Sequence, residues 1–300
     1  MIRNFKELIE KCKEIGPRTI AVAVAQDEEV LTAVDGAYKL GIAKAILVGD
    51  KEKIEGIAKA CGIDVSKFEV IDEKDNVEAA KKAVQLVSSG KADMVMKGLI
   101  GTADILRAVL DKDFGLRTGR VLSHVAVFEY EDRLMLLTDA AMNIAPDINQ
   151  KAQIVQNAVI VAKALGIDTP KVAPLAAVEL VNPDMPATID AAMLSKMAER
   201  GQIKGAIIDG PLALDNAVSV EAAQHKGIKS PVAGYADILL VPDIEAGNVL
   251  YKSIVYFAKA KICGIIAGAK APVILTSRAD SHEAKLNSIA LAVLVSYLNK

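Results

Sequence analysis

Apolar residues along this chain follow two alternating patterns. Short runs rich in β-branched residues predict strands, and longer stretches with apolar residues every three or four positions predict helices. In the first part of the chain we expect strands at 19–25, 45–48, 68–71 and 94–96, and helices at 28–40, 51–60, 77–88 and 103–110. Asp27 is placed to cap the first helix, and Gly90 to end the third. Apolar strands alternating with helices predict a parallel sheet covered on both faces.

The pattern changes after residue 115. Two extended runs, 121–130 and 133–138, predict an antiparallel hairpin. Alternation then resumes, with strands expected at 172–180, 206–208, 238–241 and 273–275, and helices at 149–165, 186–199, 218–224, 246–258 and 283–298. In the helix 186–199, Ile189, Met193 and Met197 share one face. A chain of 300 residues suits two domains, and a cleft between two α/β domains is a favoured ligand site.

Composition narrows the classes of partner. Aromatic residues make up only 4% of the chain and Trp is absent, which disfavours a base-stacking platform for single-stranded nucleic acid. The formal net charge is -2, so no global basic field attracts nucleic acid. An anionic substrate would need a local cluster of Arg, Lys and backbone N–H groups.

The cysteines and the N-terminus predict a cytoplasmic protein with no membrane contact. Cys12, Cys61 and Cys263 lie far apart without CxxC spacing, which disfavours a disulfide framework or a zinc site and favours a reducing compartment. Residues 1–16 are typical of a charged amphipathic helix rather than a signal peptide. No apolar run approaches the roughly 20 residues of a membrane span.

Several common signatures of catalytic and cofactor sites are missing. The sequence holds no GxxxxGK[ST], no GxGxxG after the first strand, no GxSxG and no HExxH. His124, His225 and His282 are isolated rather than spaced as metal ligands. We therefore expect no metal and no permanently bound cofactor.

Five polar turns instead follow predicted strands and precede predicted helices. They are residues 97–102, 138–146, 209–215, 242–248 and 276–281. Open α/β sheets bind ligands at the carboxyl ends of their strands, so these turns are candidate site segments. Ordinary strand-to-helix turns also favour Gly, Asp and Asn, so any single turn is compatible with simple turn chemistry.

The turn at 276–281 carries the sharpest chemical signal. An apolar strand leads into Thr276, Ser277 and Arg278, and a helix begins just after them. A hydroxyl donor, a guanidinium and the N–H groups of a helix start together suit a phosphate group. Arg107 lies among apolar residues of the helix 103–110, where it is either a ligand contact or a side chain that extends from a packed helix to solvent.

Five segments resemble one protein family. They are KGLIGTADILRAVL, LLTDAAMNIAPD, IIDGPLALDNAVS, SPVAGYADILLVPDIEAGNVLYK and APVILTSRADS, in order from residue 97 to 281. This pattern is similar to the phosphate acetyl/butyryltransferase family, and most similar to its butyryl-transferring members. The resemblance implies the reaction acyl-CoA + phosphate ⇌ acyl phosphate + CoA, with direct attack of the CoA thiol in a ternary complex. Acyl-CoA and phosphate would be the only partners besides further copies of the chain, since the relatives form homo-oligomers.

The same resemblance implies a fold and a set of site residues. The implied fold is two α/β domains related to isocitrate/isopropylmalate dehydrogenases, with the active site in the interdomain cleft. We place the first domain at 1–128 plus 266–300 and the second at 129–265. Ser277 and Arg278 match the family's catalytic Ser-Arg pair, where the acyl phosphate binds. The substrate-binding candidates, which lie in the matching turns and on the helix after the first of them, are Lys97, Thr102, Arg107, Asp139, Asn143, Asp243 and Asn248.

One position departs from the family pattern. The acetyl-transferring relatives carry an Asp seven residues after the active Ser, assigned as the base for the thiol, whereas this chain has Ala284 there. Asp280, His282 and Glu283 are near in sequence, but none is in register. The sequence therefore leaves the general base unassigned.

Three other functions are compatible with these residues. A phosphate acetyltransferase would run the same reaction on a shorter chain. An NAD(P)-dependent hydroxyacid dehydrogenase of the same fold would need metal-binding aspartates and an arginine cluster for a dicarboxylate. A non-catalytic CoA- or phosphate-binding protein would bind CoA without releasing thiol. The sequence also leaves open the acyl-chain preference, the oligomer number and the physiological direction.

Overall fold

The computed structural model describes residues 1–276 and 280–298. The chain divides into two compact units. We call Phe5–Arg120 with Cys263–Lys300 the first unit, and Met1–Asn4 with Val121–Ile262 the second unit. The chain thus passes between units at 120/121 and 262/263, near the crossings expected at 128 and 265; the predicted domain boundaries themselves stay a prediction.

The sheet of the first unit is mostly parallel. Its strands are β1 (Arg18–Ala23), β2 (Ala43–Gly49), β3 (Glu69–Asp72), β4 (Met94–Lys97), β10 (Ile262–Ala267) and β11 (Val273–Ile274). They lie in the order β3-β2-β1-β4-β11-β10, and β10 is antiparallel to β11. Residues 20–23 of β1 are fully buried, as expected for a strand covered on both faces.

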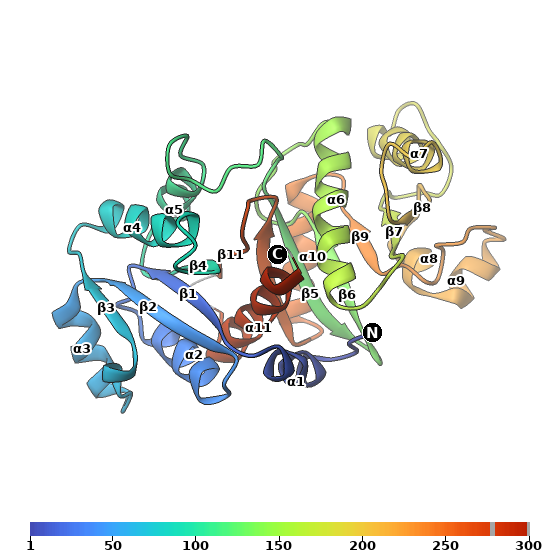
Figure 1. Cartoon of the computed structure of the whole chain (residues 1–300). Coiled ribbons are helices and arrows are strands. Elements are labelled where there is room, and N and C mark those ends of the chain that lie inside the picture. Colours follow the sequence, from blue (N-terminus) through green and yellow to red (C-terminus); the bar gives the residue numbers. More distant parts are fainter. Residues whose placement is uncertain (277–279, 299–300) are drawn as a thin grey trace. The chain divides into compact units, whose positions relative to one another are not determined.

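Helices cover both faces of this sheet. They are α1 (Phe5–Ile15), α2 (Glu28–Lys39), α3 (Lys51–Ala60), α4 (Asn76–Ser88), α5 (Thr102–Val109) and α11 (His282–Leu298), with a 3-10 turn at Val65–Lys67. Helix α11 packs against α1 and α2, whereas α4 packs against α5 and β1 (Figure 1). Helix α11 is buried from Lys285 to Ser296 apart from Leu286, which explains the long apolar stretch at this end of the sequence.

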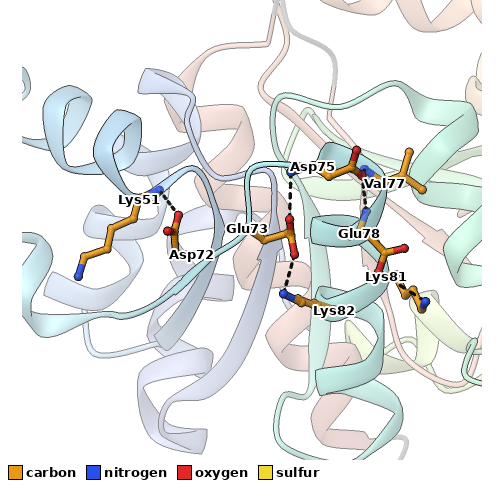
Figure 2. Close-up of polar contacts among 8 residues, drawn as sticks. All are labelled: Lys51, Asp72, Glu73, Asp75, Val77, Glu78, Lys81 and Lys82. Atoms are coloured by element: carbon orange, nitrogen blue, oxygen red, sulfur yellow. Dashed lines mark hydrogen bonds and ion pairs between the residues drawn. The ribbon is translucent and has the colours of Figure 1, made fainter.

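Acidic residues that follow β3 fix the start of α4 (Figure 2). Asp75 caps α4 by accepting from the backbone N–H groups of Val77 and Glu78, each at 2.9 Å. Glu73 accepts from the backbone N–H of Asp75 at 3.0 Å and from the Lys82 ammonium at 2.6 Å. These contacts satisfy N–H groups that a helix leaves without partners, so they set the point where the chain turns into α4.

The second unit contributes the other five strands of the sheet and five helices. Its strands are β5 (Ser123–Tyr130), β6 (Arg133–Thr138), β7 (Lys171–Pro174), β8 (Ile207–Ile208) and β9 (Ile238–Leu240), in the order β5-β6-β9-β7-β8. Only β5 and β6 are antiparallel to each other. The helices are α6 (Ile148–Ala164), α7 (Pro186–Glu199), α8 (Leu214–Val218), α9 (Val220–His225) and α10 (Ile244–Tyr256). The inner face of α10 packs on a core built from β5, β6, β7, β9 and the turns beside them.

Most predicted elements are confirmed, including the hairpin, the Asp27 cap and the α/β class. One predicted strand is too long, and two elements were missed. The strand expected at 172–180 ends at Pro174, because residues beyond Leu175 find no neighbouring strand in the described part of the chain. The helix expected at 218–224 is α9, which begins two residues later after its cap Ser219, and the short helix α8 before it was not predicted. Strand β10 was not predicted, since a short apolar run beside Gly268 gives no clear period.

The helices in the part of the chain that the structure describes are all too short or too polar to cross a membrane.

Candidate functional site

The order of strands in the first unit creates a topological switch. The chain builds β2 and β3 on one side of β1 and then returns to place β4 on the other side. Adjacent strands whose connections leave in opposite directions open a crevice at their carboxyl ends, and open α/β sheets bind ligands there. The turns after β1 and β4 are therefore a candidate ligand-binding site.

The turn after β4 is held tightly against the end of β1. The backbone N–H of Gly98 donates to Ala23 O and that of Leu99 to Val24 O, both at 2.8 Å. A Cβ at position 98 would overlap the carbonyl oxygen of Val24 and lie 2.8 Å from that of Ala23. Only glycine fits here, so the sequence Lys97-Gly98 fixes the chain at the switch point.

Lys97 places a positive charge at this point. It is 6% exposed, and its ammonium donates to the carbonyl oxygen of Gly98 at 3.4 Å. A buried ammonium is costly to keep away from water unless other groups compensate its charge. This predicted site residue therefore places a positive charge at the edge of the sheet where open α/β sheets bind ligands.

The N-terminus of α5 follows three residues after Gly98. The capping residue of α5 is Gly101, so no side chain caps the first N–H groups of this helix. Thr102, the first residue of α5, is exposed. The N–H groups and the positive end of the helix dipole are thus open to an anion. Arg107 lies in the last turn of α5 with its side chain 71% exposed and paired with Asp104 at 2.8 Å. An exposed pair of this kind is weak, so the Arg107 guanidinium is available to a stronger acceptor.

Strand β11 lies beside β4 on the side away from β1. Its residue Ile274 is opposite Met96, and Thr276 follows two residues later with only 7% of its surface exposed. The carboxyl end of β11 therefore lies at the same edge of the sheet as Lys97. Ser277 and Arg278 come next in the sequence and lie outside the described residues.

Two other predicted site residues, Asp139 and Asn143, stabilise their own turn. Asp139 is 3% exposed and accepts from the backbone N–H groups of Ala141, Met142 and Asn143 at 2.9–3.1 Å. The amide of Asn143 donates to Asp139 at 2.5 Å and to Leu122 O at 2.8 Å. The hydrogen-bonding capacity of these side chains is therefore largely used within the second unit.

The turn at 242–248 packs against this one. Asp243 caps α10 by accepting from the backbone N–H of Ala246 at 2.8 Å, and the amide of Asn248 donates to Ala140 O at 3.3 Å. A Cβ at Gly247 would lie 2.6 Å from Asp139 O, so glycine permits this close approach. The structure thus brings Asp139, Asn143, Asp243 and Asn248 together.

Sequence reasoning did not single out two buried polar residues of the first unit. Lys285, in the first turn of α11, is 3% exposed and its ammonium donates to Asp280 O at 2.5 Å. Gln26, just after β1, is 8% exposed, and its Oε1 has no hydrogen-bond partner among the described residues. A lysine within an apolar helical stretch and a glutamine ending an apolar strand were the signals that could have identified them.

The groups around position 284 do not resolve the general base. Ala284 donates its N–H to Ser281 Oγ at 3.2 Å, and the ring of His282 lies 3.9 Å from Glu29 with both side chains largely exposed. In the described part of the chain, no cluster of three His, Cys, Asp or Glu side chains could hold a metal ion. At the carboxyl ends of β4 and β11 the described residues offer an ammonium on Lys97, the N–H groups at the start of α5 and the hydroxyl groups of Thr102 and Thr276.

Comparison with known proteins agrees with this chemistry. Residues 4–84 and 75–293 match the family described as phosphate acetyl/butaryl transferase. The chain is 60% identical to a phosphate butyryltransferase of Clostridium acetobutylicum over 298 residues, which is 99% of each protein. It is 47% identical to a phosphate acetyltransferase of Thermotoga maritima, over 97% of this chain and 99% of that one. Its structure is similar to that of a branched-chain phosphotransacylase from Enterococcus faecalis V583, with a TM-score of 0.84, 37% identity and coverage of 93% and 99%.

Proposed function

Because the chain belongs to the phosphate acetyl/butaryl transferase family, we propose that it transfers an acyl group between coenzyme A and inorganic phosphate. In the direction of acyl phosphate synthesis, a phosphate oxygen attacks the thioester carbonyl carbon, the C–S bond breaks and the CoA thiolate leaves. In reverse, the CoA thiol loses its proton and attacks the acyl phosphate, and phosphate leaves. CoA is a substrate, and no permanent cofactor is needed for either direction.

The main physical difficulty is to bring two anions together and to stabilise a tetrahedral oxyanion. In this proposal Arg278 neutralises the phosphate, Ser277 donates to the developing charge, and Lys97 with the start of α5 at Thr102 adds positive potential. Arg107 would leave Asp104 to contact the substrate anion. Removing one such donor typically costs about 10²–10³ in rate.

One observation carries the proposal more than any other. Lys97 is buried at the topological switch of the first unit, beside a turn that only Gly98 can form. Open α/β sheets bind ligands at this edge, and an ammonium there attracts an anion. The full-length identity to phosphate butyryltransferases supports the same conclusion.

We further propose the finer points that the family resemblance implies. The acyl group would be butyryl. The substrate would also contact the two turns of the second unit that are stabilised by Asp139, Asn143, Asp243 and Asn248. The two units would belong to the isocitrate/isopropylmalate dehydrogenase-like class, with domains at 1–128 plus 266–300 and at 129–265. The protein would act in the cytoplasm, which agrees with its free cysteines, and as a homo-oligomer.

A thiol-release assay tests both the reaction and the acyl chain. Purified protein is mixed with phosphate and with acyl-CoA thioesters of two to six carbons, and the free CoA thiol is followed over time. We expect release that requires phosphate and is fastest with butyryl-CoA. Each methylene in a pocket is worth about 1–3 kcal/mol and butyryl has two more than acetyl, so acetyl-CoA should react more slowly rather than not at all. Thiol release that does not depend on phosphate would contradict the proposal.

A further inference from the structure

Positively charged side chains gather where α5 ends. The segment 107–120 and Lys270 together carry five positive side chains and only two negative ones, in a chain whose formal net charge is -2. One of the five, Arg107, is paired with Asp104. The other four are exposed and make no ion pair with any carboxylate that the structure describes, and we call them the basic patch: Lys112, Arg117, Arg120 and Lys270. Such a local excess of positive charge attracts an anionic ligand.

Backbone contacts hold the basic patch together. The backbone N–H of Lys270 donates to Leu116 O at 2.8 Å, and the Thr118 hydroxyl donates to Gly268 O at 2.5 Å. The backbone N–H of Arg120 in turn donates to Thr118 Oγ1 at 3.2 Å. The segment after α5 and the turn between β10 and β11 therefore lie side by side, which brings Lys270 next to the arginines of the patch.

A tight turn fixes this segment to the end of α5. The backbone N–H of Leu116 donates to Val109 O at 2.7 Å. A Cβ at Gly115 would lie 2.4 Å from Asp111 O and 2.6 Å from Val109 O, so only glycine permits the turn. The Asp111 carboxylate accepts from the backbone N–H of Asp113 at 2.8 Å, so it stabilises the turn rather than neutralising the patch.

One aromatic ring lies in the same turn. Phe114 is partly exposed, and the Lys81 ammonium, from α4, lies 5.8 Å from the centroid of its ring. A partly exposed ring bordered by cations can stack with a nucleobase, because every base has a flat face, while the cations bind the phosphate groups of the same ligand. The end of α5 thus offers both kinds of contact that a nucleotide needs.

Helix α5 connects the proposed phosphate site to the basic patch. It begins at Thr102, in the turn that follows Lys97, and its eight residues span about 12 Å. In CoA a flexible pantetheine arm separates the reacting sulfur from the diphosphate, and this arm is longer than α5 when it is extended. A CoA molecule whose sulfur lies near the start of α5 can therefore reach the patch with its nucleotide end.

We propose that the basic patch and Phe114 bind the nucleotide end of coenzyme A. The guanidinium and ammonium groups contact the diphosphate and the 3′-phosphate, and the ring stacks on adenine. Arginine suits this task because its planar donors bind phosphate oxygens in pairs. The inference rests on the proposed function, since it names the surface that recognises one end of the CoA substrate.

Calorimetry tests the patch without any reaction. We compare CoA with dephospho-CoA, which lacks the 3′-phosphate, on the wild type and on the double variant Arg117→Gln/Lys270→Gln. We expect Kd for CoA to rise about 10–100-fold in the double variant, since charge-assisted hydrogen bonds are lost, and the preference for CoA over dephospho-CoA to shrink. Lys91→Gln, which removes an exposed lysine of the first unit outside the patch, is the matched control and should bind CoA as the wild type does.

Phe114→Leu tests the stacking contact separately. The variant keeps an apolar side chain and removes the ring. We expect it to weaken CoA and dephospho-CoA by the same factor, about tenfold, because both ligands carry adenine. Unfolding midpoints in urea show whether this variant and the double variant are folded. Unchanged affinity for both ligands in folded Phe114→Leu would refute the stacking contact.

Kinetics separate this inference from the proposed reaction. In the double variant, KM should rise for butyryl-CoA and not for S-butyryl-pantetheine, which has neither phosphate nor adenine. Equal rises for the two substrates, or a wild-type Kd for CoA in the folded double variant, would overturn the patch. If the wild type nevertheless releases thiol in the presence of phosphate, the acyltransferase stands. Conversely, CoA binding that needs the patch, in a protein without phosphate-dependent thiol release, would keep the patch and refute the reaction.

Discussion

The ammonium of Lys285 donates to the carbonyl oxygen of Asp280 at 2.5 Å. This contact joins the first turn of α11 to the end of the segment 276–281, in which the sequence places Ser277 and Arg278. A lysine that is 3% exposed at this place both adds positive charge and restrains the turn. The contact makes Lys285 a positioning residue for the proposed phosphate site.

Lys285→Met tests that role. The Met side chain keeps most of the buried volume and removes the charge and the hydrogen bond. We expect kcat to fall by about 10–100-fold and KM for phosphate to rise, with KM for acyl-CoA nearly unchanged, because an interaction with one substrate is lost. Lys59→Met, at an exposed position of α3, is the control. Wild-type kinetics in Lys285→Met would show that the residue is only structural.

Gly98→Ala tests the geometry of the switch point. The added Cβ would overlap Val24 O, so the turn after β4 must move away from β1. We expect a loss of roughly 3 kcal/mol or more in the free energy of unfolding, measured in urea. Gly56→Ala, in the middle of α3 with no atom within 4 Å of its Cβ position, should instead stabilise the protein by about 1 kcal/mol. Equal stability of Gly98→Ala and the wild type would be inconsistent with this backbone packing.

Asp139→Ala separates a structural role from substrate binding. Its carboxylate accepts three backbone N–H bonds and one amide bond, all of which lose their acceptor in the variant. Buried donors without partners cost about 1–3 kcal/mol each in the worst case, so we expect a loss of roughly 2–4 kcal/mol after relaxation. Asp132→Ala, at the exposed hairpin turn, should change stability by less than about 0.5 kcal/mol. Unchanged stability with lost activity would mean that Asp139 serves the substrate alone.

The three cysteines should differ in their reaction with thiol reagents. Burial raises the pKa of the Cys12 thiol to about 12 and the pKa of Cys263 well above its ordinary value. Since the thiolate is the reactive form, only about 1 in 10⁴ Cys12 side chains would be ionised at pH 8, which slows the reaction even where the reagent has access. Burial and the neighbouring Glu28 also raise the pKa of Cys61, but this residue is half-exposed.

We therefore expect Cys61 to be labelled first, slowly, in the native protein, and Cys12 and Cys263 only after denaturation. Absorbance of a disulfide reagent gives the number of thiols, and mass spectrometry of the labelled peptides gives their positions. Cys61→Ser should show almost no labelling in the native state. Rapid labelling of Cys12 would contradict its burial.

Much of the fold could be predicted from local patterns. The bounds of α3 and α7 agree with the sequence, and Asp27 caps α2 as expected, because side chains within a few residues decide these features. Strand β10 and the end of β7 could not be predicted, since a short apolar run becomes a strand only where a neighbouring strand completes its hydrogen bonds. That information is not local in the sequence.

The candidate site was predictable only in part. Lys97 and the turns after β4 and β6 follow from polar residues at strand ends. The apolar stretch around Lys285 could have marked it as a candidate, but its burial depends on how α11 packs against α1 and α2, which the sequence does not show. The exposure of Arg107 likewise depends on its hydrogen bond to Asp104, which only the structure reveals.

Phosphorus NMR of the reaction mixture tests the central claim most directly. Protein, butyryl-CoA and inorganic phosphate should give a new acyl phosphate resonance that grows in step with free CoA thiol, and omission of any one component should abolish both. Arg278→Ala, folded normally, should slow this conversion by at least about a hundredfold, because the guanidinium proposed to bind phosphate is lost. Thiol release without an acyl phosphate resonance, or near-normal conversion by Arg278→Ala, would contradict the account.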